Sequence, residues 1–150
     1  MKAFYTLLIL LIPFIGFGQI VNIPDANFKA YLVGETSINT NGDFEIQVSE
    51  ANTFNGTIHT GGLFIYDLSG IEHFTSLTEL NCNSNQLSTL NVSQNTALTV
   101  LNCGGNDLTS IELNANLTEL HCNNNQLSTL DVSQNTALTV LNCRGNDLTN

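Results

Sequence analysis

Leu77-Thr-Glu-Leu80-Asn-Cys82-Asn-Ser-Asn85-Gln-Leu87 is the stretch of sequence that decides the fold. The same pattern, apolar-x-x-Leu-x-Cys-x-x-Asn-x-Leu, returns at residues 98–108, 117–127 and 138–148. A pattern that recurs at a spacing of about 20 residues indicates a solenoid, in which each unit packs only against its neighbours. The repeats therefore predict one domain built by stacking similar turns.

A weaker copy precedes the four clear ones. We place its first residue at Ile58, which puts Tyr66 where the later copies have asparagine. The five repeats then start at residues 58, 77, 98, 117 and 138, at intervals of 19, 21, 19 and 21 residues, and the last repeat is incomplete. The alternation indicates that a two-repeat unit of 40 residues was duplicated. Residues 77–109 and 117–149 differ at four pairs of positions: Asn81/His121, Ser84/Asn124, Asn91/Asp131 and Gly104/Arg144.

Side chains within each copy alternate as they do in a β-strand. Leu80 and Cys82 face one side, whereas Glu79, Asn81 and Asn83 face the other. Copies stacked about 4.8 Å apart form a parallel sheet. Units this short leave little room for an α-helix on the return path, so we expect extended or 3-10 segments there, with a second short strand at residues 90–92.

Stacking also aligns the repeated asparagines and cysteines in two columns. The asparagines are predicted to satisfy backbone groups that the turn after each strand leaves unpaired. They are Asn85, Asn106, Asn125 and Asn146. Adjacent cysteines would have nearly parallel Cα–Cβ bonds, which keeps their Cβ atoms farther apart than a good disulfide requires. We therefore predict reduced, buried thiols at Cys82, Cys103, Cys122 and Cys143.

These copies resemble leucine-rich repeats, whose pattern is Leu-x-x-Leu-x-Leu-x-x-Asn-x-Leu with cysteine allowed at the sixth position. The short units and the Thr-Leu-Asn/Asp-Val-Ser-Gln-Asn-Thr-Ala linker resemble secreted or surface bacterial proteins of the internalin-like sort. The resemblance covers residues 58–150. It implies a leucine-rich-repeat solenoid of the α/β class, rich in strands, with the parallel sheet on its concave face.

Residues 1–18 have the pattern of a secretory signal peptide. Lys2 is followed by an apolar run over residues 7–15 and by small residues at 16 and 18, which predicts cleavage before Gln19. The apolar run is too short to cross a hydrocarbon core of about 30 Å comfortably. We therefore expect a secreted or cell-surface protein that does not insert into the membrane once the signal is removed.

Residues 19–57 have no cysteine and form the expected N-terminal cap, with a helix over residues 24–33. This cap contains a loop whose oxygen-bearing side chains have a spacing similar to that of an EF-hand. The candidate calcium ligands are Asn39, Asn41, Asp43, Glu45 through its carbonyl, and Glu50. The alternative is a metal-free turn in which Ser49 or Glu50 begins a helix through Phe54. No cofactor is required by either interpretation, and Ca²⁺ is the one candidate.

The composition argues against several classes of partner and against catalysis. The chain has 13 acidic residues against three basic ones, so it has no basic patch that would attract nucleic acid or an anionic membrane. The histidines, at 59, 73 and 121, have no evident partner nucleophile, because the cysteines are expected to be buried. We therefore expect a protein that is not an enzyme.

The outward-facing strand positions form three predicted columns on the concave face. Solenoids present such rigid faces to partners. The predicted function is therefore to bind an extracellular protein or glycan, as a monomer. The candidate contact residues are Glu79, Asn81, Asn83, Asn102, Glu119, His121, Asn123, Asn142 and Arg144.

Two alternatives stay open at this point. The near-identity of the two 40-residue units favours a structural surface spacer without a specific ligand, because an evolved binding face usually diversifies. The sequence also ends at Asn150 in the middle of a repeat, without a C-terminal cap. The second alternative is therefore the repeat region of a larger secreted enzyme, truncated at residue 150. In that case we expect the remainder to hold further repeats, a catalytic domain or a sorting signal.

Overall fold

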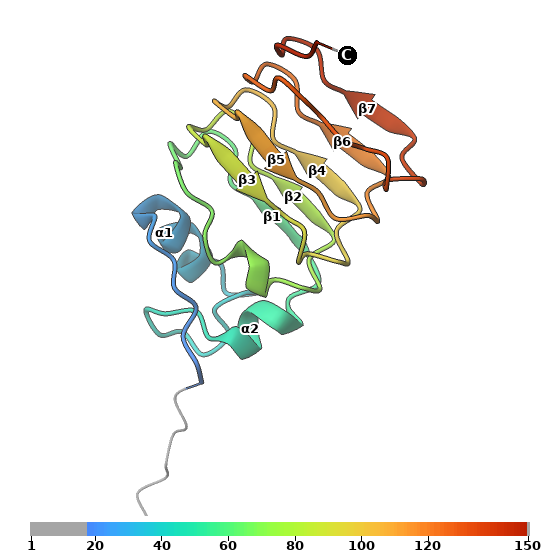
Figure 1. The fold of residues 1–150 in the computed structure, drawn as a ribbon. Helices are drawn as coiled ribbons and strands as arrows, with labels where there is room; N and C mark the ends of the chain where they lie inside the picture. The colour runs from blue at the N-terminus through green and yellow to red at the C-terminus, as the bar shows by residue number, and fades with distance from the viewer. Residues whose placement is uncertain (1–17, 150) are drawn as a thin grey trace, which may run out of the picture.

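The computed structural model describes residues 18–149 as a solenoid with helices at one end (Figure 1). The predicted signal peptide lies outside these residues, apart from its last position. Helices α1 (Ala26–Gly34) and α2 (Val48–Thr53) come first, and a 3-10 helix, η1 (Ile71–His73), follows the first repeat's strand. No helix among residues 18–149 is long and apolar enough to cross a membrane.

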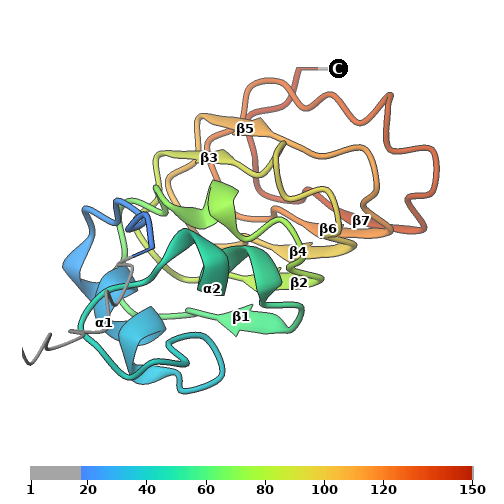
Figure 2. The ribbon, with the colours of Figure 1, turned by 90° about the horizontal axis from the view of Figure 1, so that it is seen from below.

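The repeats form two parallel sheets on opposite sides of the stacked turns (Figure 2). The larger sheet has the order β1-β2-β4-β6-β7, and its outward side is called the concave face below. Its strands are Thr57–His59, Glu79–Asn81, Val100–Asn102, Glu119–His121 and Val140–Asn142. The smaller sheet pairs β3 (Thr89–Asn91) with β5 (Ser110–Glu112), which confirms the second strand predicted near Leu90.

Equivalent residues of successive turns pair with each other, as a stacked repeat requires. Leu80 lies beside Leu101, which lies beside Leu120. All three side chains are fully buried, because each points inward from the middle of its strand. The leucine positions of the repeat therefore build one continuous core, and no single turn could bury them alone.

The predicted frame of the first repeat is wrong by three residues. Ile58 pairs with Leu80 rather than occupying the position of Leu77. Ile58, Ile65 and Leu68 have the same spacing as Leu80, Leu87 and Leu90, and all six are buried. The predicted frame put Leu63 at the buried cysteine position and Tyr66 at the asparagine position, but these two residues are 37% and 61% exposed. The pattern of buried residues, rather than the best match to the motif, therefore shows where the first repeat begins.

The column of asparagines is confirmed, and each member joins two turns. Asn106 Nδ2 donates to the carbonyl oxygens of Cys82 and Cys103, both at 3.0 Å, and its Oδ1 accepts from Leu87 N at 3.1 Å. The same contacts recur at Asn85, Asn125 and Asn146. These amides satisfy backbone groups of the turn that water cannot reach.

A second asparagine column on the opposite side was not predicted. Asn95 is fully buried, and its Nδ2 donates to the carbonyl oxygens of Ile71 at 2.7 Å and Phe74 at 3.0 Å. Asn135 Nδ2 likewise donates to Asn114 O at 2.6 Å in the preceding turn. The recurring Gln-Asn-Thr-Ala linker was the available signal, and its asparagine closes the return path of each long repeat.

The four cysteines have no disulfide partner in the structure, as predicted, and three of them are buried. Burial raises the pKa of the Cys82 thiol to about 12 and that of Cys122 to about 11. The pKa of Cys103 is also raised well above its ordinary value, first by burial and then by the charges that Cys82 and Cys122 would carry. Thr60 occupies the equivalent position in the first turn and is buried too.

We predict that the folded state loses stability as the pH rises from 9 to 11. Unfolded thiols ionise near pH 9, whereas burial keeps the folded thiols protonated, so the unfolded state binds fewer protons in this window. Each thiol adds a slope of about 1.4 kcal/mol per pH unit. Urea unfolding of the wild type and of Cys82→Ala at several pH values measures it. The variant should show a shallower fall, and identical slopes would contradict the prediction.

The cap covers the first turn of the solenoid, and Asp25 connects the two. This buried carboxylate begins α1, where Oδ1 accepts from Asn27 N and Phe28 N at 2.9 Å. Its Oδ2 accepts from Tyr66 N at 2.9 Å and Asp67 N at 3.3 Å in the first repeat. The predicted helix over 24–33 is therefore α1, and its N-cap also fixes the helix to the solenoid.

Candidate ligand-binding face

The strand pairing confirms two of the three predicted columns of outward side chains. Glu79, Val100, Glu119 and Val140 lie side by side, and so do Asn81, Asn102, His121 and Asn142. Strand β1 adds Thr57 to the first column and His59 to the second. Sequence reasoning missed these two residues because its frame for the first repeat was displaced.

The third column lies just after the strands and is continued by backbone hydrogen bonds. Ser84 N donates to Gly104 O, Gly105 N to Asn123 O, and Asn124 N to Arg144 O, at distances of 2.7 to 2.9 Å. These bonds place Asn83, Gly104, Asn123 and Arg144 at equivalent positions, as predicted. All nine predicted contact residues therefore lie on one face of the molecule.

The asparagine side chains of this face differ in whether their Nδ2 donors are paired. Asn81 and Asn102 each accept a hydrogen bond from a backbone N–H two residues later, at 3.2 Å. Their Nδ2 groups donate to no other group among residues 18–149. Asn142, by contrast, donates from Nδ2 to Asn123 Oδ1 at 3.2 Å. Unpaired donors therefore gather on the turns of the first 40-residue unit.

His121 and Glu119 form the one ion-pair geometry in the part of the concave sheet that the structure describes. The His121 Nε2 to Glu119 Oε1 distance is 2.6 Å, and the two side chains are 29% and 40% exposed. No hydroxyl or thiol hydrogen-bonds to His121 within residues 18–149, so the pair lacks the nucleophile that a hydrolytic site would need. The contact with Glu119 fixes the orientation of the imidazole.

A hollow of about 190 Å³ opens beside the third column. Four asparagines, one serine and two glycines line it, and they come from three successive turns. They are Asn83, Ser84, Asn102, Gly104, Gly105, Asn123 and Asn124. The hollow carries no charged side chain, although the chain as a whole is strongly acidic.

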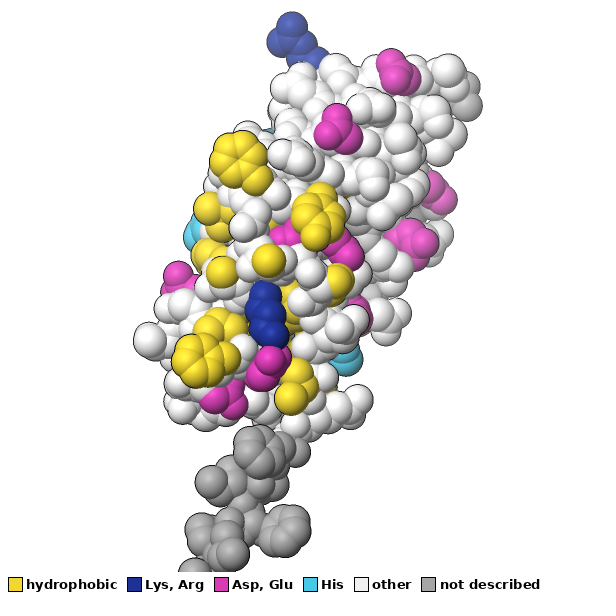
Figure 3. All heavy atoms as spheres, turned by 90° about the vertical axis from the view of Figure 1, so that its left-hand side faces the viewer, with side chains coloured by type: hydrophobic (Ala, Val, Ile, Leu, Met, Phe, Trp, Pro, Cys, Tyr) yellow, Lys and Arg dark blue, Asp and Glu magenta, His cyan; other side chains and the backbone are white. Residues whose placement is uncertain are grey.

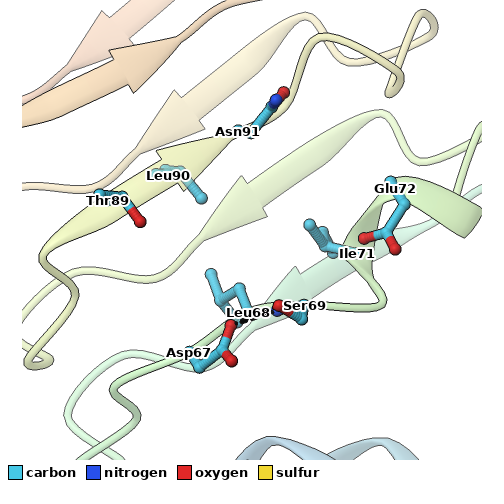
Figure 4. Close-up of a pocket in the computed structure, with 8 residues that line it drawn as sticks. All are labelled: Asp67, Leu68, Ser69, Ile71, Glu72, Thr89, Leu90 and Asn91. Carbon is cyan, nitrogen blue, oxygen red and sulfur yellow. Dashed lines mark hydrogen bonds between the residues drawn. The ribbon is translucent and has the colours of Figure 1, made fainter. Parts of the chain in front are cut away.

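Another hollow, of about 140 Å³, lies on the opposite side between the first two turns (Figure 4). It forms where the first turn enters η1 instead of pairing a strand with β3. Its carboxylates accept hydrogen bonds from nearby backbone groups of the same turn: Asp67 Oδ1 accepts from Ser69 N at 2.8 Å, and Glu72 Oε2 accepts from Gly70 N at 2.8 Å. We assign no ligand to this hollow.

Exposed apolar side chains gather on the end formed by the cap and the first repeat (Figure 3). Phe44, Phe64 and Tyr66 are 85%, 72% and 61% exposed. Phe64 has a φ of 58°, a left-handed conformation that a bulky residue rarely adopts. Lys29 and Glu45 form an ion pair at 2.7 Å on the same cap. The repeat pattern did not predict this patch, because its displaced frame put Tyr66 at the buried asparagine position.

The loop predicted to bind calcium has its oxygens occupied by internal donors. Glu50 Oε1 accepts from Thr40 N at 2.8 Å and Asn41 N at 3.2 Å, and Oε2 accepts from Gln47 N at 3.0 Å. Asp43 Oδ1 accepts from Glu45 N, and Oδ2 accepts from Asn41 Nδ2 and Gln47 Nε2. Residues 18–149 contain no group of three or more acidic, histidine or cysteine side chains able to hold a metal.

As folded, this loop does not fit a calcium ion. The Glu50 carboxylate forms a capping box with Gln47 at the start of α2, as the metal-free interpretation requires, although Gln47 rather than Ser49 or Glu50 is the N-cap. The oxygens of Asn39 and Asn41 accept from Gly42 N at 3.1 Å and Asp43 N at 2.8 Å. An ion would have to compete with these N–H donors for the same oxygens, which favours the metal-free turn over the predicted calcium site.

We expect the melting temperature to be the same in excess calcium and in excess chelator, because Asp43 and Glu50 are already satisfied. Thermal unfolding of the wild type and of Asp43→Ala under both conditions measures this. The variant itself should be less stable, but only the calcium-dependent difference matters. A rise with calcium in the wild type that Asp43→Ala abolishes would contradict the expectation and establish the site.

Comparison with known proteins identifies the repeats. No family model matches the sequence, and no curated protein matches it. Among solved structures, the functional domain of InlJ from Listeria monocytogenes, described as including a cysteine ladder, is 39% identical with a TM-score of 0.74. The match covers 88% of this chain and 30% of that one. The chain has the leucine-rich-repeat fold seen in this internalin, and its short repeats are similar.

A second internalin shows the same fold at lower similarity. InlF from Listeria monocytogenes str. 4b F2365 is 19% identical, with a TM-score of 0.52, and the match covers 85% of this chain and 45% of that one. The leucine-rich-repeat chain therefore spans less than half the length of either internalin. The stacked cysteines Cys82, Cys103, Cys122 and Cys143 correspond in kind to the ladder described for InlJ.

Proposed function

We propose that this leucine-rich-repeat chain is the binding region of a secreted or cell-surface protein and that its concave face contacts an extracellular protein or glycan. The proposed role is non-catalytic. The similarity to internalins supports a surface binding protein in general terms. The choice of face rests on an observation within the chain itself.

The two 40-residue units differ where a partner would touch them. Of the four differences, Asn81/His121 and Gly104/Arg144 lie in columns of the concave face, and Ser84 and Asn124 line the hollow beside it. Asn91/Asp131 lies on the opposite side. The leucine, cysteine and asparagine positions of the core are unchanged. If the substitutions after duplication had been limited only by the need to keep the fold, they would not favour one exposed face. Their distribution therefore supports binding over a passive spacer.

The test is capture of a partner from surface extracts by the mature chain. We expect the double variant Glu119→Ala and His121→Ala to weaken capture at least tenfold, the loss expected from truncating central contacts. Asp131→Asn is the matched control, because it copies the first unit on the opposite side and should capture normally. Loss of capture in Asp131→Asn with none in the double variant would overturn the proposal. Failure of the wild type to capture any specific partner would favour the spacer.

A further inference from the structure

The hollow beside the third column has an unusual surplus of free amide groups. The Nδ2 groups of Asn102 and Asn123 donate to nothing within residues 18–149, and neither end of the Asn124 amide is paired there. Asn83 donates from Nδ2 to Ser84 Oγ at 3.1 Å, and its Oδ1 lies over Gly61 of the first turn. Donors and acceptors from three turns therefore line one concave space of about 190 Å³.

The chemistry of this lining matches a neutral molecule rich in hydroxyl groups. An amide offers both a donor and an acceptor, and a hydroxyl can use both. A hollow of this size has room for roughly six water molecules at about 30 Å³ each, which is comparable to a single sugar ring. Acidic glycans fit less well, since the chain has 13 acidic residues against three basic ones and the hollow has no basic side chain of its own.

A peptide fits the same hollow less well. Peptide recognition sites are dominated by aromatic or aliphatic anchors in apolar pockets. No aromatic, aliphatic or charged side chain lines the hollow, whereas the exposed aromatic residues of this protein lie at the cap end. The observations therefore favour a sugar over a peptide segment as the occupant.

Gly104 keeps the floor of the hollow open. A Cβ atom at this position would lie 2.9 Å from Asn123 Oδ1, so any side chain would push the Asn123 amide out of place. The equivalent residue in the second unit is Arg144. The two units thus differ at two positions of the lining, Gly104/Arg144 and Ser84/Asn124.

From this geometry we infer that the hollow around Gly104 binds a neutral sugar residue of a glycan, held by the amides of Asn102 and Asn123. The inference rests on the proposed binding function of the concave face and specifies its ligand class. Asn102 and Asn123 donate from their Nδ2 groups to the hydroxyl oxygens of the sugar, and Asn83 and Asn124 border it. The His121–Glu119 pair borders the same site through the neighbouring column.

The experiment is binding of the mature chain to an array of neutral, sialylated and sulphated oligosaccharides, followed by calorimetric titration of the best neutral glycan. Two variants should bind at least tenfold more weakly: Gly104→Arg, which copies the second unit and fills the hollow, and Asn102→Asp, which exchanges a donor for a carboxylate. Asn91→Asp copies the second unit on the opposite face and should bind as the wild type does. Circular dichroism and thermal unfolding confirm that each variant is folded.

Three results would overturn the inference: no binding to any neutral glycan, a preference for sialylated or sulphated glycans, or full binding by folded Gly104→Arg. If no glycan binds but a protein is captured through Glu119 and His121, the sugar site is wrong and the proposed function stands. If neither a glycan nor a protein binds, both fail.

Discussion

Replacing Asn106 by alanine is expected to lower the free energy of unfolding by about 3–5 kcal/mol. The change removes two hydrogen bonds to the carbonyl oxygens of Cys82 and Cys103 and one from Leu87 N. The buried Leu87 N is left without an acceptor, and the carbonyl oxygens of Cys82 and Cys103 keep only their bonds from Asn85 and Asn125. Because domains of this size are stable by only about 5–15 kcal/mol, the loss should be severe.

Urea unfolding monitored by circular dichroism measures this loss. Gln94→Ala is the control, because Gln94 is exposed and makes only a marginal contact with Ser93 at 3.5 Å; it should change stability by about 0.5 kcal/mol or less. Asn106→Asp keeps the acceptor but loses both donated bonds, so it should be nearly as damaging as alanine. A loss below about 1 kcal/mol in Asn106→Ala would mean that the column does not hold the turns together.

Asp25→Ala should detach the cap from the first repeat at a cost of about 3 kcal/mol. The substitution removes the N-cap of α1, which contributes about 1 kcal/mol, and leaves the N–H groups of Tyr66 and Asp67 without their acceptor. Hydrogen exchange should show faster exchange in α1 and in the turn at residues 65–67 than in β4 and β6. Each turn of a solenoid contacts only the turns next to it, so the effect should stay near the cap.

Two further variants make this prediction specific. Asp25→Asn keeps a single acceptor oxygen and should give an intermediate loss. Glu35→Ala, at an exposed position just after the same helix, should leave exchange unchanged. Uniform acceleration of exchange along the whole solenoid in Asp25→Ala would contradict a local role for this residue.

The repeat pattern was enough to predict most of the fold. Leucine at positions equivalent to Leu80 and the cysteine two residues later must face inward, because alternate side chains of a strand point to opposite sides. The role of Asn106 in satisfying backbone groups of the turn also followed from its position after the end of a strand. In both cases one physical requirement acts identically on every turn, so the sequence expresses it repeatedly.

The first repeat and the cap could not be predicted in the same way. The turn at residues 58–68 matches the motif poorly in either frame, and only its pairing with β2 shows that Ile58, Ile65 and Leu68 are buried. The bond from Asp25 to Tyr66 joins residues 41 apart in the sequence and belongs to no motif. Contacts that occur once leave no periodic signal.

The candidate binding face was predicted by position but not by chemistry. Stacking predicted that Asn81, Asn102 and His121 would lie in one column, and the strand pairing agrees. Which amide end remains free, and that Glu119 engages His121, depends on side-chain orientation that the pattern does not specify. The hollow around Gly104 likewise depends on the Asn123 side chain of the next turn.

The central claim is that the core positions build the fold while the concave face carries binding. Hydrogen exchange and hydroxyl-radical labelling of residues 19–150, with and without the captured partner, test this claim most directly. Protection should appear at residues 79–83, 100–104 and 119–123, and β3 and β5 should be unaffected. Protection confined to β3 and β5, with the concave face still accessible, would contradict the account.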